Sequence, residues 1–161
     1  PTTRRRRASW PAGCATTMPE AAAPPPRVVL DTNVLYAGLY SASGQSHRLL
    51  RTVAAARVRI VLSTPLLFEY EDVLRRDPQV LGLSGRDIDV VLDNLCALAD
   101  HQRIHFLWRP MLRDAKDDMV LELAVAAGAR CIVTFNGRDF GPAAQFGIEV
   151  LNPKQLLERL R

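Results

Sequence analysis

Five acidic residues of this chain could do chemistry together. Asp31 directly follows the apolar run "RVVL", Glu69 lies within "LLFEYEDVL", Asp117 and Asp118 open the stretch "DDMVLELAVAAG", and Asp139 lies in "NGRDF". Carboxylates held close together repel one another and raise one another's pKa unless a cation neutralises them. Oxygen ligands without His or Cys select Mg²⁺ or Mn²⁺ over zinc. These acids therefore predict a site for a hard divalent cation, provided that the fold brings them together.

Each acid also has a purely structural interpretation. Asp31 could be the N-cap of a helix over "TNVLYAGL", and Asp117 and Asp118 could be first-turn acids that the helix dipole favours. Asp139 could be an ordinary turn residue. Glu69 is harder to explain in this way, because it falls on the inward side of its helical repeat. Only a shared position in the fold favours the functional interpretation.

The elements that must position these acids alternate along the chain. Continuously apolar or β-rich runs predict strands over residues 27–31, 58–63, 103–107, 131–135 and 148–152. Helical periodicity and capping residues predict helices over 46–56, 64–76, 84–100, 117–128 and 152–161, with Thr64, Ser84 and Asn152 as N-caps and Gly128 as a C-cap. Such alternation predicts a three-layer α/β/α fold with a mainly parallel central sheet of about five strands.

The same fold predicts where the acids meet. In open α/β sheets, ligands bind beyond the carboxyl ends of the strands, and right-handed crossovers bring parallel strand ends to one edge. Asp31 and the polar residues Thr134 and Asn136 follow strand ends directly, and Asp139 comes in the next turn. Glu69 lies near the start of the helix after the second strand. We therefore expect Asp31, Glu69, Asp117 and Asp139 to converge at this edge.

The chain divides into a tail and one domain. Residues 1–26 combine "RRRR", alanines and prolines without an apolar period, which is typical of disorder, and Met18 offers an alternative start of translation. Residues 27–161 have the size and apolar content of a single domain. No apolar run is long enough to span a bilayer, and the three cysteines lack a metal-ligand or disulfide pattern, so we expect a cytoplasmic protein without membrane contact.

Net charge alone does not predict the partner. The chain carries +4, but residues 1–26 contribute four arginines and one glutamate, which leaves 17 basic and 16 acidic residues for 27–161. The predicted domain is thus nearly neutral. An interaction with nucleic acid must therefore depend on a local site.

These motifs resemble, in order, the acidic motifs of the PIN-domain ribonucleases, in particular bacterial toxins of the virulence-associated protein C type. The resemblance extends from residue 27 to about 153. It implies that Asp31, Glu69, Asp117 and Asp139 are the four catalytic, metal-binding carboxylates, with Asp118 as a further candidate ligand. It also implies that Asn33, Thr134 and Asn136 orient the ligands or the attacking water without binding the metal themselves.

The resemblance implies an Mg²⁺- or Mn²⁺-dependent endoribonuclease that hydrolyses RNA phosphodiester bonds, leaving a 5′-phosphate and a 3′-hydroxyl. Such toxins are commonly held inactive by a cognate antitoxin protein, and they usually form homodimers.

Two other functions remain open from the sequence. A catalytically inactive PIN-like module would bind RNA or a partner without cleaving it, although four intact acids argue against this. A phospho-receiver signalling domain would need an Asp at the end of the third strand, where "RIHFLW" has none.

Overall fold

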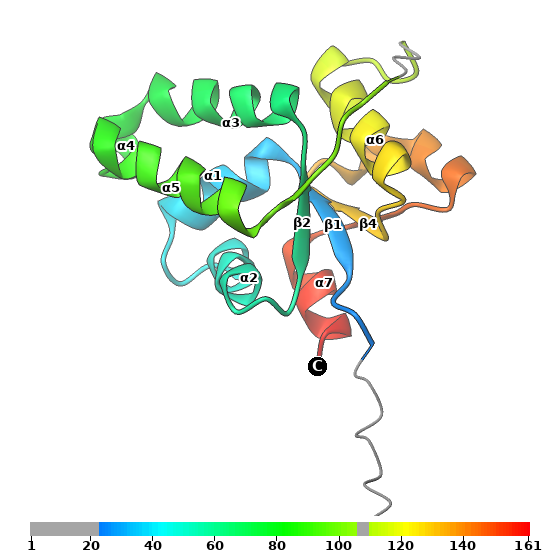
Figure 1. Cartoon of the computed structure of the whole chain (residues 1–161), viewed down its shortest axis with the longest axis horizontal. Helices are drawn as coiled ribbons and strands as arrows, with labels where there is room; N and C mark the ends of the chain where they lie inside the picture. The colour runs from blue at the N-terminus through cyan, green and yellow to red at the C-terminus, as the bar shows by residue number, and fades with distance from the viewer. Residues whose placement is uncertain (1–22, 106–109) are drawn as a thin grey trace, which may run out of the picture.

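A computed structural model of the chain describes residues 23–105 and 110–161 (Figure 1). The predicted tail falls mostly outside these residues, as does Met18, and residues 23–26 form neither helix nor strand. Five strands are present: β1 (Arg27–Leu30), β2 (Arg59–Leu62), β3 (Asp100–His101), β4 (Cys131–Val133) and β5 (Glu149–Leu151).

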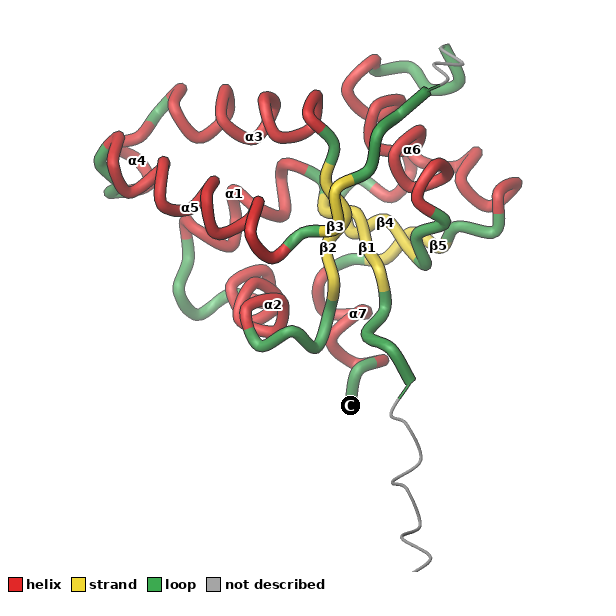
Figure 2. Tube along the Cα trace, in the orientation of Figure 1, coloured by secondary structure: helices red, strands yellow, loops and turns green. Residues whose placement is uncertain are grey.

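The five strands form one parallel sheet in the order β3-β2-β1-β4-β5 (Figure 2). Every pairing is parallel, and the register places Val28 opposite Ile60 on β2 and opposite Cys131 on β4. The central strands β1, β2 and β4 are mostly apolar because helices cover both faces of the sheet. The predicted α/β class and five-stranded parallel sheet are therefore confirmed.

The helices lie in two outer layers. Figure 1 shows α1 (Thr32–Tyr40), α2 (Gln45–Ala54), α3 (Thr64–Arg76), α4 (Pro78–Leu81) and α5 (Gly85–Leu98) to one side of the strands. On the other side lie α6 (Ala115–Ala127) and the 3₁₀ segment η1 (Gly137–Phe146). The last helix, α7 (Pro153–Arg159), packs against α2 and β5.

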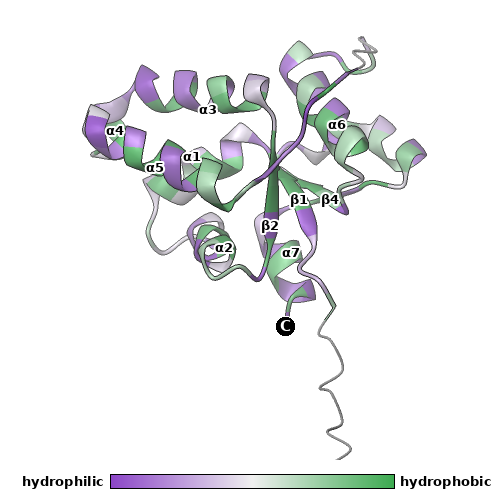
Figure 3. Cartoon of the chain, in the orientation of Figure 1, coloured by the Kyte–Doolittle hydropathy of each residue, from purple (hydrophilic) through white to green (hydrophobic). Residues whose placement is uncertain are grey.

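One contiguous core joins these layers. Val28, Val29 and Ile132 in the central strands are fully buried, and Leu66 on α3 and Leu121 on α6 belong to the same buried cluster. Figure 3 shows the apolar strands at the centre, with polar residues on the outer sides of the helices. No helix in the described part of the chain is long and apolar enough to cross a membrane.

Most predicted boundaries are accurate to within one or two residues. Ser84 forms a capping box with Asp87, and Asn152 forms one with Gln155. Gly128 ends α6 with a φ of 57°, a left-handed conformation that favours glycine.

Four details differ from prediction. Of the strand predicted at 103–107, residues 103–105 form no strand and 106–107 lie outside the described residues, and β3 is the polar pair Asp100–His101. Ser63, rather than Thr64, caps α3, since its hydroxyl accepts a hydrogen bond from the Leu66 N–H. Helix α6 begins two residues early, with Asp114 as its N-cap. Helix α4 and the 3₁₀ segment η1 were not predicted from the sequence.

Candidate active site

The carboxyl ends of β1 and β4 lie side by side and bring two polar residues together. Leu30 pairs with Val133, so the next residues along each strand, Asp31 and Thr134, are neighbours. The Asp31 N–H donates a hydrogen bond to the Val133 carbonyl at 2.9 Å. The Thr134 hydroxyl donates to Asp31 Oδ2 at 2.6 Å. The sheet register therefore fixes the position of the Asp31 carboxylate.

Two asparagines complete this network. Asn33 Nδ2 donates to Thr134 Oγ1 at 3.4 Å, and the Asn136 backbone N–H donates to the same oxygen at 2.9 Å. With both donors directed at its oxygen, the Thr134 hydroxyl has its proton free to bond to Asp31. The three predicted supporting residues, Asn33, Thr134 and Asn136, thus belong to one hydrogen-bond network that ends at the Asp31 carboxylate.

Asp31 is an acid held in a nearly closed environment. It stands at the N-cap position of α1 but makes no capping hydrogen bond, and it is only 8% exposed. Burial raises the pKa of Asp31, while the Thr134 hydroxyl and, more weakly, nearby groups of Thr32 and Asn33 oppose the rise. Below it, the Tyr70 hydroxyl donates to the Leu30 carbonyl, and burial together with the Asp31 charge raises the pKa of Tyr70.

Asp117 lies close enough to Asp31 for their charges to interact. It comes from the first turn of α6 and is partly exposed. Burial and, in decreasing order, the charges of Asp31, Asp114, Asp139 and Asp118 together raise the pKa of Asp117 to about 6. Four neighbouring negative charges therefore disfavour the ionised form of Asp117.

Asp31 and Asp117 face a cleft of about 450 Å³, which we call the acidic cleft. It lies between the N-terminal parts of α1 and α6 and the C-terminal part of α3. Its lining combines acids, amides and two cations: Asp31, Asn33, Asp77, Asp114, Asp117, Asn136, Arg76 and Lys116, with Thr32, Tyr36 and Val73. A concave site with carboxylates of raised pKa at the carboxyl edge of a parallel sheet is a typical location for catalysis.

The other predicted acids are placed differently. Asp139, in the first turn of η1, is exposed and does not line the cleft, although its charge reaches Asp117. The Glu69 side chain, 16% exposed, also lies outside the lining and pairs with Lys116 Nζ at 2.8 Å. Asp118 is 2% exposed, and its Oδ1 accepts the backbone N–H groups of Met111 and Leu112 at 3.1 and 2.8 Å.

Four charged residues of the cleft were not predicted from the sequence, namely Asp77, Asp114, Arg76 and Lys116. Asp114 caps α6 by accepting the Lys116 N–H at 2.9 Å, and it faces the cleft as well. The motif "RDAKDD" could have revealed it, because Asp is among the residues preferred at a helix N-cap. The cations Arg76 and Lys116 had no local signal, since they enter the cleft through the packing of α3 against α6.

The donor chemistry of the cleft fits a hard divalent cation. Carboxylate and amide oxygens line it, no His or Cys does, and the mutual repulsion around Asp117 is what a cation would relieve. Within 23–105 and 110–161, however, no three His, Cys, Asp or Glu residues are grouped closely enough to hold an ion. The residues present therefore fit such an ion in type and charge, and their side chains would have to approach one another to bind it.

Comparison with known proteins identifies the family. No curated protein matches the chain closely enough to count as a relative. The family model described as "PIN domain" matches residues 27–138, a range that contains Asp31, Glu69, Asp117 and the strands β1 to β4. This match covers well over half of the chain. Together with the parallel sheet and its acidic edge, it shows that the chain belongs to the PIN domain family, whose members are generally nucleases.

Proposed function

We propose that this protein is a metal-dependent endoribonuclease that hydrolyses RNA phosphodiester bonds in the acidic cleft. The observation that carries the proposal is the charge coupling between Asp31 and Asp117 at the carboxyl edge of the sheet. Folding places these acids together against their mutual repulsion, a cost that a purely structural role would not need. The four catalytic residues in this proposal are Asp31, Asp117, Asp139 and Glu69.

In this proposal the network behind Asp31 keeps the carboxylate in one orientation. The Thr134 hydroxyl holds Oδ2, and Asn33 and the Asn136 N–H fix that hydroxyl. Asp31 itself lines the cleft. Such preorganisation avoids reorienting the carboxylate when charge develops at the scissile phosphate.

Asp31 and Asp117, with Asp139 nearby, are the residues that we assign to hold Mg²⁺ or Mn²⁺. The ion would supply positive charge against the phosphate oxygens and make a nucleophilic water more acidic. Lys116 and Arg76 add fixed positive charge on the cleft wall, where they can meet a substrate phosphate.

Glu69 and Asp118 differ from these two acids in their present partners. Glu69 would join the site only after exchanging its ion pair with Lys116, so we assign it a role once substrate attracts that lysine. Asp118 has both N–H groups of the 111–112 segment on one oxygen, and we assign to it the support of that segment rather than ligation.

Substitution of Asp31 tests the proposal. Asp31→Asn should abolish cleavage of single-stranded RNA while leaving the free energy of unfolding equal or higher, because it removes charge repulsion but keeps the shape. Asp93 is an exposed acid on α5 that lies outside both the cleft and the core. Asp93→Asn is therefore the matched control, and this variant should cleave RNA normally. EDTA should stop cleavage and Mn²⁺ should restore it. Full activity of Asp31→Asn would overturn the mechanism.

The finer assignment within the family is a cytoplasmic toxin that is restrained by an antitoxin and forms a homodimer. Its support is the order of the four acidic motifs. Expression in a bacterial host should arrest growth, Asp31→Asn should not, and the product of an adjacent small gene should relieve the arrest. Light scattering would measure the dimer. Growth without arrest would contradict the toxin role while leaving the nuclease proposal intact.

The second candidate is an inactive module that binds RNA or a protein partner. The ion pair between Glu69 and Lys116 favours it, because one of the four acids is already neutralised. The cleavage assay separates the two functions: RNA binding without metal-stimulated cleavage by the unsubstituted protein would support the module.

A further inference from the structure

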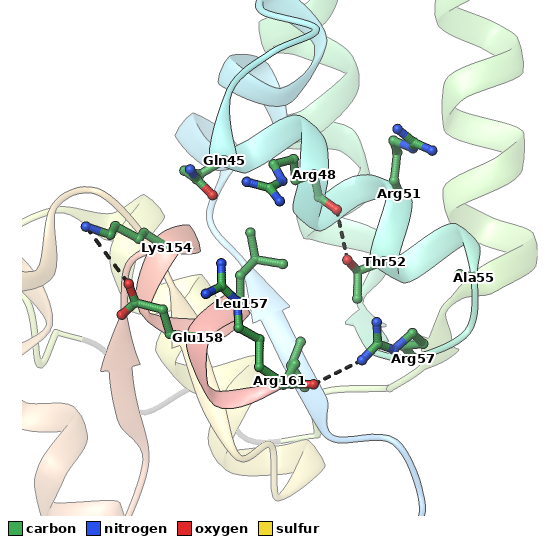
Figure 4. A pocket seen from close by; sticks show the side chains of 11 residues that line it. Gln45, Arg48, Arg51, Thr52, Ala55, Arg57, Lys154, Leu157, Glu158 and Arg161 are labelled. Atoms are coloured by element: carbon green, nitrogen blue, oxygen red, sulfur yellow. Dashed lines mark hydrogen bonds and ion pairs between the residues drawn. The ribbon is translucent and has the colours of Figure 1, made fainter.

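A second concave site lies between α2 and α7, away from the acidic cleft (Figure 4). We call it the basic groove. It has a volume of about 390 Å³ and is lined by five cationic side chains and a single carboxylate, namely Arg48, Arg51, Arg57, Lys154, Arg161 and Glu158. The acidic cleft and the basic groove share no lining residue.

The groove collects positive charge that the rest of the domain lacks. Residues 27–161 carry 17 basic and 16 acidic residues, a net +1. The groove holds five of those basic residues and one acidic residue, a net +4, so the remainder of the domain carries 12 against 15, a net −3. The fold therefore separates charge strongly although the composition is balanced.

Helix ends explain only part of this charge. The C-terminal ends of α2 and α7 meet here, and Arg57 Nη2 donates to the Leu160 carbonyl at 3.0 Å. Each helix end is equivalent to roughly half a negative charge, so two ends offset about one of the four positive charges. Lys154 lies 3.9 Å from Glu158, a loose exposed pair. Within the described residues, the side chains of Arg48 and Arg51 form no hydrogen bond or ion pair.

The chemistry of the groove selects a phosphate backbone rather than a protein surface. Protein interfaces usually centre on buried aromatic or apolar anchors with few charges. None of the large exposed apolar side chains, Tyr40 and Phe68 among them, lines this groove. The absence of an aromatic ring there also removes a platform for stacking bases. Arginine forks facing a groove instead match the paired oxygens of phosphates, which are contacted without regard to sequence.

The course of the groove connects it to the catalytic edge. Helix α7 begins after Asn152, just beyond the carboxyl end of β5, which is the same edge of the sheet as the acidic cleft. Its last residues reach Arg57, just before β2 starts at the opposite edge. The groove thus follows one face of the domain from the catalytic edge to the far edge.

We propose that the basic groove binds the phosphodiester backbone of the RNA substrate, outside the segment that is cleaved, through Arg48, Arg51 and their cationic neighbours. This inference rests on the proposed nuclease function. It specifies the substrate class as RNA long enough to occupy both sites, with the scissile bond at the acidic cleft and the backbone anchored in the groove.

Binding measured without cleavage tests the groove. The full chain carrying Asp31→Asn, in EDTA, is titrated with a long uridine homopolymer at several salt concentrations. Arg48→Gln with Arg51→Gln changes the net charge by −2, and Arg86→Glu on α5, outside both sites, changes it equally and is the matched control. Arg51→Gln with Arg161→Gln is a second combination, should the first fail to fold by circular dichroism.

Each lost phosphate contact removes about 0.7 from the slope of log K against log salt concentration, where K is the association constant for RNA. The groove variant, which loses two contacts, should therefore have a slope shallower by about 1.4 and should bind RNA about 25-fold more weakly near 0.1 M salt. The control should stay near the parent. Equal weakening of variant and control, or no weakening, would overturn the groove proposal. If the groove variant loses binding to a poly-glutamate peptide but not to RNA, the groove proposal is also overturned, and the groove binds an acidic protein segment instead.

The two proposals fail differently in this design. If the protein without substitutions cleaves RNA while the groove variant binds normally, only the groove proposal is wrong. If the groove variant loses binding while the unsubstituted protein never cleaves, only the nuclease proposal is wrong.

Discussion

At the scale of single residues, the raised pKa of Asp117 makes the ion-free cleft a source of instability. Folding raises the pKa of the Asp117 carboxyl from 3.8 to about 6, so the folded state favours the protonated form. The stability that this preference contributes is fully present below pH 3.8. That contribution is lost as the pH rises through about 6. Asp117→Asn should therefore unfold like the parent at pH 4 in EDTA and should be more stable by about 1 kcal/mol at pH 7, after allowance for solvent screening.

Urea unfolding at both pH values measures this difference. Asp93→Asn, an exposed acid outside both sites, should show no comparable gain on raising the pH. A parent protein that gains stability over Asp117→Asn between pH 4 and pH 7 would contradict the charge repulsion assigned to the cleft.

The Thr134 hydroxyl holds the Asp31 carboxylate in place through one hydrogen bond. Thr134 is 2% exposed, and Thr134→Val keeps its shape while removing the donor to Asp31. We expect a loss of about 1–3 kcal/mol of unfolding free energy and a fall in kcat of at least about tenfold, because the buried carboxylate loses its partner. Thr134→Ser keeps the hydroxyl and should restore most of the kcat. If Ser and Val variants behave alike, the hydrogen bond has no positioning role.

At the scale of elements, the end of α6 can be tested through its glycine. Gly128 has a φ of 57°, and a Cβ there would meet no atom within 4 Å. Gly128→Ala should cost about 1 kcal/mol from backbone strain alone. Gly141→Ala in η1 is the matched control, since it also has open space but no positive φ, and it should be neutral or slightly stabilising. Thermal unfolding checks both, and equal costs would show that strain is not the cause.

The elements also show what the sequence could and could not predict. Strands β1, β2 and β4 were predictable because both of their faces are buried, which demands continuous apolar runs. The edge strand β5 is only partly buried, and its β-rich run "IEVLN" still predicted it. Strand β3 was not predictable, because this two-residue edge strand pairs with only β2 and tolerates the polar pair Asp100 and His101. The apolar pattern after it predicted a strand that the described residues 103–105 do not form.

The candidate site was predictable only as far as strand ends decide it. Asp31 and Thr134 were expected to meet because a parallel register fixes neighbours at the sheet edge. The partner of Glu69 was not, because Lys116 lies 47 residues away and on another helix. Helical periodicity predicted that the Glu69 side chain points inward, but it carries no information about which cation lies opposite.

At the scale of the whole molecule, one core and one cleft link ion binding to global stability. The buried apolar residues form a single cluster that includes every strand except the polar β3, so we expect one cooperative unfolding transition. An ion that binds only the folded state then stabilises the entire domain by RT ln(1 + [ion]/Kd), about 2.7 kcal/mol at 100 times Kd. For a domain of this size, that corresponds to a rise in Tm of roughly 5–10 °C.

Thermal unfolding with and without Mn²⁺ therefore tests the metal assignment independently of cleavage. The parent protein should gain stability with Mn²⁺ and lose it with EDTA, because the ion removes the repulsion between Asp31 and Asp117. Asp31→Asn and Asp117→Asn should start more stable without the ion and gain little from it, whereas Asp118→Asn should respond to Mn²⁺ like the parent from a lower starting stability. An equal shift in all four proteins would place the ion outside the acidic cleft.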